Sequence, residues 1–177
     1  MDVCVVDGWE TFKGWTPYLM GIFVLIVWHL QKGKEVIANE SKICIMDITE
    51  QISLINHIQN EFCLSLHQKT TYNYDQELKE VANLSIKVSR SLNFINFERN
   101  KIESKIIDDY FNNIAFFILD YEQTYKKVTY SEELEKKLFD QYAAIHTIGY
   151  KILISLNKIA LYKLINTKAC RCTAPHT

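Results

Sequence analysis

Apolar residues recur at helical spacing from residue 35 onward, in four segments separated by polar turns. The segments cover residues 35–68, 76–97 and 101–127, and a last one that continues to about residue 164. Side chains three and four residues apart lie on one face of a helix, so each segment is predicted to be an amphipathic helix with one buried stripe. In the first segment the stripe is a heptad that only Gln59 interrupts. The predicted stripes contain Ile45, Ile48, Ile52, Ile55, Phe62, Leu66, Val81, Leu84, Val88, Leu92, Ile95, Ile107, Tyr110, Ile114, Phe117, Tyr121, Leu134, Leu138, Ile145, Ile148, Ile152, Leu156 and Ile159.

The breaks between these segments carry helix-ending and helix-starting signals. Lys69–Asp75 is rich in Thr, Asn and Asp, which favour turns. Thr129 and Glu132 have the T-x-x-E spacing of a capping box and open the last helix. Only 5 Gly and 2 Pro occur in 177 residues, too few for the many tight turns of an all-β fold. The sequence therefore predicts an all-α protein with one helical bundle.

A different pattern fills Gly14–Leu30, which contains no charged residue over 17 positions. As a helix this segment is about 25 Å long, slightly under the roughly 30 Å of a bilayer's hydrocarbon core. Trp15 lies near one end and Trp28 near the other, as in an aromatic belt, and Pro17 suits a first helical turn. We expect a single N-terminal transmembrane helix. The alternatives are a buried core helix and a signal peptide, although the acidic leader lacks the basic region that a signal peptide needs.

Lysine counts on the two sides of this segment predict its orientation. Only Lys13 precedes it, whereas Lys32, Lys34 and Lys42 follow closely. The positive-inside rule then places the C-terminal side in the cytoplasm. The expected organisation is an extracytoplasmic segment (1–13), a transmembrane helix (14–30), a cytoplasmic helical bundle (31–166) and a C-terminal tail (167–177).

Two glycines in the span either favour self-association or have no particular role. Gly14 and Gly21 are seven residues apart and share a helix face, and small residues let helices approach closely. A short span is also accommodated by oligomerisation. A ring of such helices would enclose an apolar lumen that opens and closes by wetting. The candidate lining or packing residues are Tyr18, Gly21, Ile22, Val24, Leu25 and Trp28.

Composition excludes several functions. The net charge is −1, which does not favour a strongly basic nucleic-acid-binding surface. The sequence contains no Gly-rich phosphate loop, no H-E-x-x-H and no G-x-S-x-G. Cys170 and Cys172 precede His176, but their spacing matches no standard zinc pattern and a fourth ligand is missing. We therefore expect no metal site and no cofactor.

Arg171 and His176 form an R-x4-H motif in an all-helical chain. HEPN ribonucleases use such a pair, the His to move protons at the RNA 2′-hydroxyl and the Arg to stabilise charge on the phosphorus. With the short length, the Gly14–Leu30 span and the helical body, the motif makes the chain resemble the small membrane accessory proteins of type VI-B CRISPR–Cas systems.

This resemblance implies a divergent HEPN-like bundle, a function and a location. It implies a ring-shaped homo-oligomer, an octamer, that forms a pore in the bacterial inner membrane. The pore would enhance the antiphage defence of an RNA-guided, RNA-cleaving effector by depolarising the membrane. The motif lies within the last seven residues and Pro175 excludes a helix there, so the His is poorly held for catalysis. We expect no enzyme activity. A membrane-tethered ribonuclease using Arg171 and His176 with RNA as substrate, and a passive membrane scaffold for a partner protein, are the alternatives.

Overall fold

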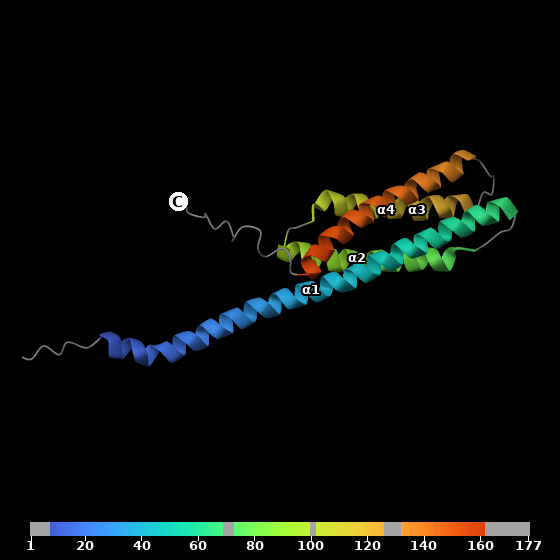
Figure 1. Cartoon of the computed structure of the whole chain (residues 1–177). Helices are drawn as coiled ribbons and strands as arrows, with labels where there is room; N and C mark the ends of the chain where they lie inside the picture. The colour runs from blue at the N-terminus through green and yellow to red at the C-terminus, as the bar shows by residue number, and fades with distance from the viewer. Residues whose placement is uncertain (1–7, 69–72, 100–101, 126–131, 162–177) are drawn as a thin grey trace, which may run out of the picture. The chain divides into compact units, whose positions relative to one another are not determined.

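The computed structural model describes four helices and no strand in residues 8–68, 73–99, 102–125 and 132–161 (Figure 1). The all-α prediction is confirmed for this part of the chain. The helices are α1 (Gly8–Gln68), α2 (Asp75–Arg99), α3 (Ser104–Tyr125) and α4 (Glu132–Ala160).

α1 joins two segments that the sequence pattern treats separately. It runs without interruption through the uncharged stretch and the first heptad segment, across Gly33. Pro17 therefore lies inside the helix and not in its first turn, so that expectation was wrong. Figure 1 shows a bend in the dark blue beginning of α1, which is the usual effect of a proline that cannot donate to the carbonyl four residues earlier.

The chain divides into two compact units. The first contains residues up to Ile37 and the second begins at Ala38. We call residues 8–37 of α1 the stem, and the described residues of the second unit the bundle. The expected limits at residues 13, 30 and 166 remain predictions.

No described helix is both long enough and apolar enough to cross a membrane. The expected transmembrane helix over 14–30 thus has no support in the structure. Polar residues inside that segment, such as Thr16 and His29, reduce its mean hydropathy.

Contacts between helices define the topology of the bundle. Glu40 meets Ser91 and Gln51 meets Val81, so α1 and α2 are antiparallel. α1 and α3 are parallel, because Gln51 meets Tyr110 eleven residues before Phe62 meets Tyr121. α3 and α4 are antiparallel, since Asp120 pairs with Lys137 whereas Tyr110 lies beside Gly149. This is the up-down-up-down arrangement of a four-helix bundle.

Most of the predicted stripes form the core, but one row of α1 is shifted by one residue. Ile48, Ile55 and Phe62 are buried as expected. Ile45 and Ile52 are only half-buried, and Cys44 and Gln51 replace them in the interior. The other core side chains on α2, α3 and α4 include Val81, Leu84, Val88, Leu92, Ile95, Ile107, Tyr110, Ile114, Phe117, Tyr121, Leu138, Ile145, Ile152, Leu156 and Ile159, all predicted.

The buried Gln51 is fully hydrogen-bonded. Its Nε2 donates to the Val81 carbonyl at 3.0 Å and to Ser85 Oγ at 2.6 Å. Its Oε1 accepts from the Tyr110 hydroxyl at 2.9 Å. A buried carboxamide is tolerated when its donors and acceptor are paired, so these bonds account for Gln51 in a heptad position.

Gly149 lets α4 approach this layer. A Cβ at this position would lie 2.8 Å from Ile52 Cδ1 and 3.1 Å from Tyr110 Cε2. Any side chain would therefore displace Ile52 or the ring that hydrogen-bonds Gln51. The glycine therefore serves the close packing of α4 against this layer.

A second layer of the bundle consists of aromatic rings. The centroid distances are 5.1 Å for Phe62–Tyr121, 6.4 Å for Phe62–Tyr74 and 4.4 Å for Phe117–Tyr121. These rings come from α1, α3 and the residue just before α2. Most of the pairs are edge-to-face, the arrangement that aromatic quadrupoles favour.

Replacing Tyr110 by Phe should destabilise the bundle. The variant keeps the ring but leaves Gln51 Oε1 buried without its donor, which costs about 1–3 kcal/mol. Tyr150→Phe is the matched control, because Tyr150 is 60% exposed. Urea unfolding followed by circular dichroism measures both, and equal stability of the two variants would contradict the role assigned to the Gln51 network.

Candidate functional site

The stem carries a large exposed apolar surface. Its large side chains from Trp15 to Leu30 are between 51% and 70% exposed. They are Trp15, Tyr18, Leu19, Met20, Ile22, Phe23, Val24, Leu25, Ile26, Trp28 and Leu30. Soluble monomers rarely leave such a continuous apolar area in water, so this surface is a candidate interaction site.

The predicted lining residues all belong to this surface, but their exposure does not distinguish an inner face. Gly21 has open space around it, and so has Gly14. Helical spacing does separate two stripes: Gly14, Tyr18, Gly21, Leu25 and His29 follow one side of the helix. Leu19, Phe23, Ile26 and Leu30 follow the other. The first stripe contains two glycines and two polar rings, whereas the second consists only of bulky apolar side chains.

The two thiols in the described part of the bundle are not activated nucleophiles. Cys44 is fully buried, and burial raises the pKa of its thiol to about 12, with smaller contributions from the carboxylates of Asp47 and Glu40. Burial also raises the pKa of Cys63, and Glu135 adds to this as a charge and as a hydrogen-bond partner. Both groups are therefore protonated at neutral pH, whereas reactive cysteines have lowered pKa values.

A hollow of about 280 Å³ lies between α1 and the first turns of α4. We call it the α1–α4 hollow. It is lined by Gln59, Cys63, Glu132, Glu135, Lys136 and Phe139. Its residues combine hydrogen-bond acceptors, one ammonium group and one aromatic ring.

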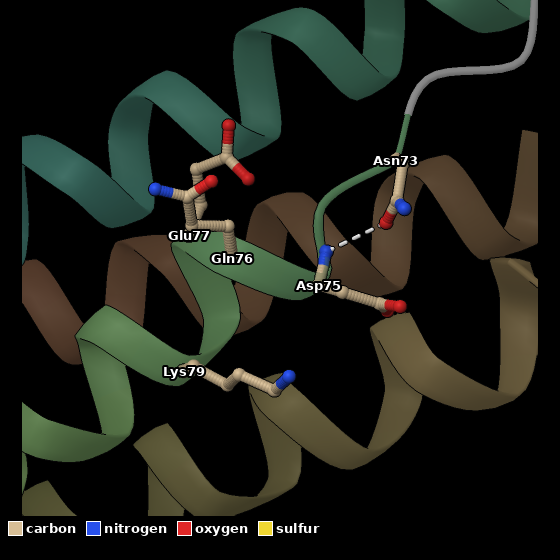
Figure 2. Close-up of a pocket in the computed structure, with 5 residues that line it drawn as sticks. All are labelled: Asn73, Asp75, Gln76, Glu77 and Lys79. Atoms are coloured by element: carbon tan, nitrogen blue, oxygen red, sulfur yellow. Dashed lines mark hydrogen bonds between the residues drawn. The ribbon is translucent and has the colours of Figure 1, made fainter.

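A second hollow, of about 440 Å³, lies at the start of α2 (Figure 2). Asn73 caps this helix, its Oδ1 accepting a hydrogen bond from the Asp75 backbone N–H at 2.9 Å. Asp75 and Glu77 lie in the first turn, where carboxylates are favoured by the helix dipole. Figure 2 shows Lys79 on the opposite side of the helix from Glu77, so the two do not converge on a common point. This hollow is the solvated start of a helix.

An ion pair on the bundle surface links α3 and α4. Lys137 Nζ lies 3.0 Å from Asp120 Oδ1, and Gln141 Nε2 donates to the other oxygen of the same carboxylate. Lys137 is 57% exposed, so the pair fixes local geometry more than it stabilises the fold.

The remaining candidate residues have different outcomes. His57 and His146 are both exposed on the bundle. Cys170, Arg171, Cys172 and His176 lie outside the described residues, and both the R-x4-H motif and the tail cysteines stay untested. Within the described residues, no three His, Cys, Asp or Glu side chains are grouped to hold a metal ion.

No protein family, curated protein or solved structure matches this chain.

Sequence reasoning did not find the α1–α4 hollow. In the sequence pattern Gln59 is only an interruption of the heptad, and that interruption is the available signal. Cys63 and Glu135 are 72 positions apart in the sequence, and no local pattern indicates that they meet.

The raised pKa of Cys44 predicts a loss of stability at alkaline pH. The pKa of this thiol is 9.0 when unperturbed and about 12 in the folded protein. Its contribution to the free energy of unfolding is therefore complete below pH 9 and is lost as the pH rises toward 12. The slope for one such proton reaches about 1.4 kcal/mol per pH unit.

Urea unfolding under reducing conditions at several pH values between 9 and 12 tests this. The free energy of unfolding of Cys44→Ala should fall less steeply with pH than that of the wild type. Burial also raises the pKa values of Tyr110 and Tyr121, but both tyrosines are present in the two proteins. Identical slopes would show that the Cys44 thiol does not titrate as its burial requires.

Proposed function

We propose that this protein acts at a membrane as a non-enzymatic oligomer, in which the stems of several copies associate and form an apolar-lined pore. The single observation that supports this is the exposure of eleven large apolar side chains between Trp15 and Leu30. Burial of apolar surface is worth about 25 cal/mol per Å², so a stem in water is strongly driven toward lipid or toward other stems.

The two stripes of the stem suit different surroundings. In the proposed assembly, Gly14, Tyr18, Gly21 and Leu25 lie between neighbouring stems, where glycines allow close helix contact. Phe23, Ile26 and Leu30 then face lipid. The proposal therefore does not require a single stem to cross the bilayer alone, because the more polar stripe is shielded by the other copies.

The proposed physiological role follows from the resemblance described above. The pore would lie in the bacterial inner membrane, with the N-terminus outside and the bundle in the cytoplasm. It would consist of a ring of copies of this chain, and the resemblance implies eight. By depolarising the membrane it would act as an accessory of an RNA-guided, RNA-cleaving CRISPR effector.

A passive membrane scaffold is the second candidate function. It is favoured by the outer face of α4 and the residue after it, where Phe139, Tyr150, Ile154 and Leu161 are each 41–60% exposed. Such a stripe is suited to contact with a helix of a partner protein. A ribonuclease function has no comparable support among the described residues.

Charges on the lipid-facing stripe should abolish membrane binding. The double variant Phe23→Glu/Ile26→Glu places two carboxylates in the middle of the apolar segment, where each charged residue costs about 2.5–3.5 kcal/mol. Flotation with liposomes should show more than a hundredfold loss of binding. Met46→Glu is the control, because Met46 is 70% exposed on the bundle part of α1 and should leave binding unchanged. Equal flotation of the double variant and the wild type would contradict a membrane role.

Dye release from the same liposomes separates the two candidate functions. If the protein forms a pore, the wild type should release the dye from the liposomes. In detergent, the mass of the particle should be a multiple of the 20.8 kDa of one chain. Flotation without release, by a monomer or dimer, would favour the scaffold and exclude the pore.

A further inference from the structure

The α1–α4 hollow contains a buried polar atom that the described residues leave unsatisfied. Gln59 is only 6% exposed and lines the hollow. Its Oε1 has no hydrogen-bond partner among the described residues. Buried side-chain oxygens nearly always accept a hydrogen bond, so this carbonyl is an acceptor that lacks its donor.

A second unsatisfied group lies at the same end of the bundle. Tyr121 is 1% exposed, and its hydroxyl also has no partner in the described part of the chain. Its ring centroid lies 5.1 Å from that of Phe62, the residue before Cys63 on α1, and its pKa is raised first by burial and then by Cys63 and Tyr74. Two buried polar groups in or near this hollow thus have no hydrogen-bond partner among the described residues.

The charges around the hollow determine the kind of occupant. Glu132 and Glu135 contribute two carboxylates, and Lys136 contributes one ammonium group. Cys63 is a neutral thiol that hydrogen-bonds to Glu135. Gln59 Oε1 and the carboxylates are all acceptors, and an acceptor-rich hollow with more negative than positive groups favours a cation with several N–H donors.

The aromatic wall favours an organic cation over a metal ion. Phe139 is 58% exposed and lines the hollow with its ring, which attracts ammonium groups and alkyl chains alike. The described residues contain no group of three His, Cys, Asp or Glu side chains that could hold a metal. A volume of about 280 Å³ accommodates a short aliphatic amine.

We infer that the α1–α4 hollow binds a small aliphatic amine, with one ammonium group donating to Gln59 Oε1 and to Glu132, and with the alkyl chain against Phe139. This site is independent of the proposed pore, since all its residues belong to the bundle.

Calorimetric titration of the purified full-length chain with 1,4-diaminobutane tests the site. Saturable binding with one site per chain is expected, together with a higher midpoint of thermal unfolding. Tetramethylammonium carries a positive charge but no N–H donor, so it should bind at least tenfold more weakly. No saturable binding of the diamine, or equal binding of tetramethylammonium, would overturn the inference.

A pair of glutamate variants separates specific contact from general charge. Glu132→Gln should weaken diamine binding by about tenfold, the effect of losing one charge-assisted hydrogen bond. Glu133→Gln removes the same charge from the same turn at a residue that does not line the hollow, and it should bind as the wild type does. Equal losses in both variants would reduce the effect to nonspecific charge attraction and would refute the site.

Gln59→Met tests the buried acceptor. It keeps the approximate volume of the side chain and should lose diamine binding while the helical circular dichroism spectrum is retained. If this variant does not fold, the two glutamate variants, which change exposed residues, still decide the outcome. Unchanged binding in a folded Gln59→Met protein would contradict the proposed contact.

Discussion

The hydrogen bonds of the Gln51 carboxamide are the interaction on which the bundle's register depends. They connect α1 to the Val81 carbonyl of α2 and to the Tyr110 hydroxyl of α3. Apolar side chains pack with little directional preference, so a bundle made only of Ile and Leu tolerates several helix registers. A buried amide that is paired in one arrangement and unpaired in the others penalises the alternatives. In this protein one residue therefore fixes the alignment of three helices.

Much of the fold was predictable from the sequence, and the exception is informative. The turn-forming residues around 69–75 and the capping signal at Thr129–Glu132 placed the helix ends within a few residues, except for the start of α1. The buried row of α1 was predicted one residue too late. Two neighbouring rows have the same spacing of three and four residues, and the row through Ile45 and Ile52 is the more apolar of the two. The structure buries Cys44 and Gln51, because a partner 59 residues away satisfies the amide. Periodicity within one helix contains no information about that partner.

The candidate sites differ in the same way. The stem surface was predictable residue by residue, since an uncharged run on one helix needs no tertiary contact to be recognised. The α1–α4 hollow was not, because its acceptors come from helices that meet only after folding. The protein thus combines an apolar segment that lacks a core of its own with a bundle in which buried polar atoms of Gln59, Tyr121 and Gln141 have no hydrogen-bond partner among the described residues.

The close approach at Gly149 has a consequence for tracing the ancestry of this chain. Gln51, Tyr110 and Gly149 depend on one another: the amide needs the phenol, and the phenol ring needs an unsubstituted neighbour on α4. Substitution of any one of them is expected to require compensation at the others. Three such residues, separated by 59 and 39 positions, form a sparse signature that can persist in distant homologues after the surface and the loops have diverged beyond alignment.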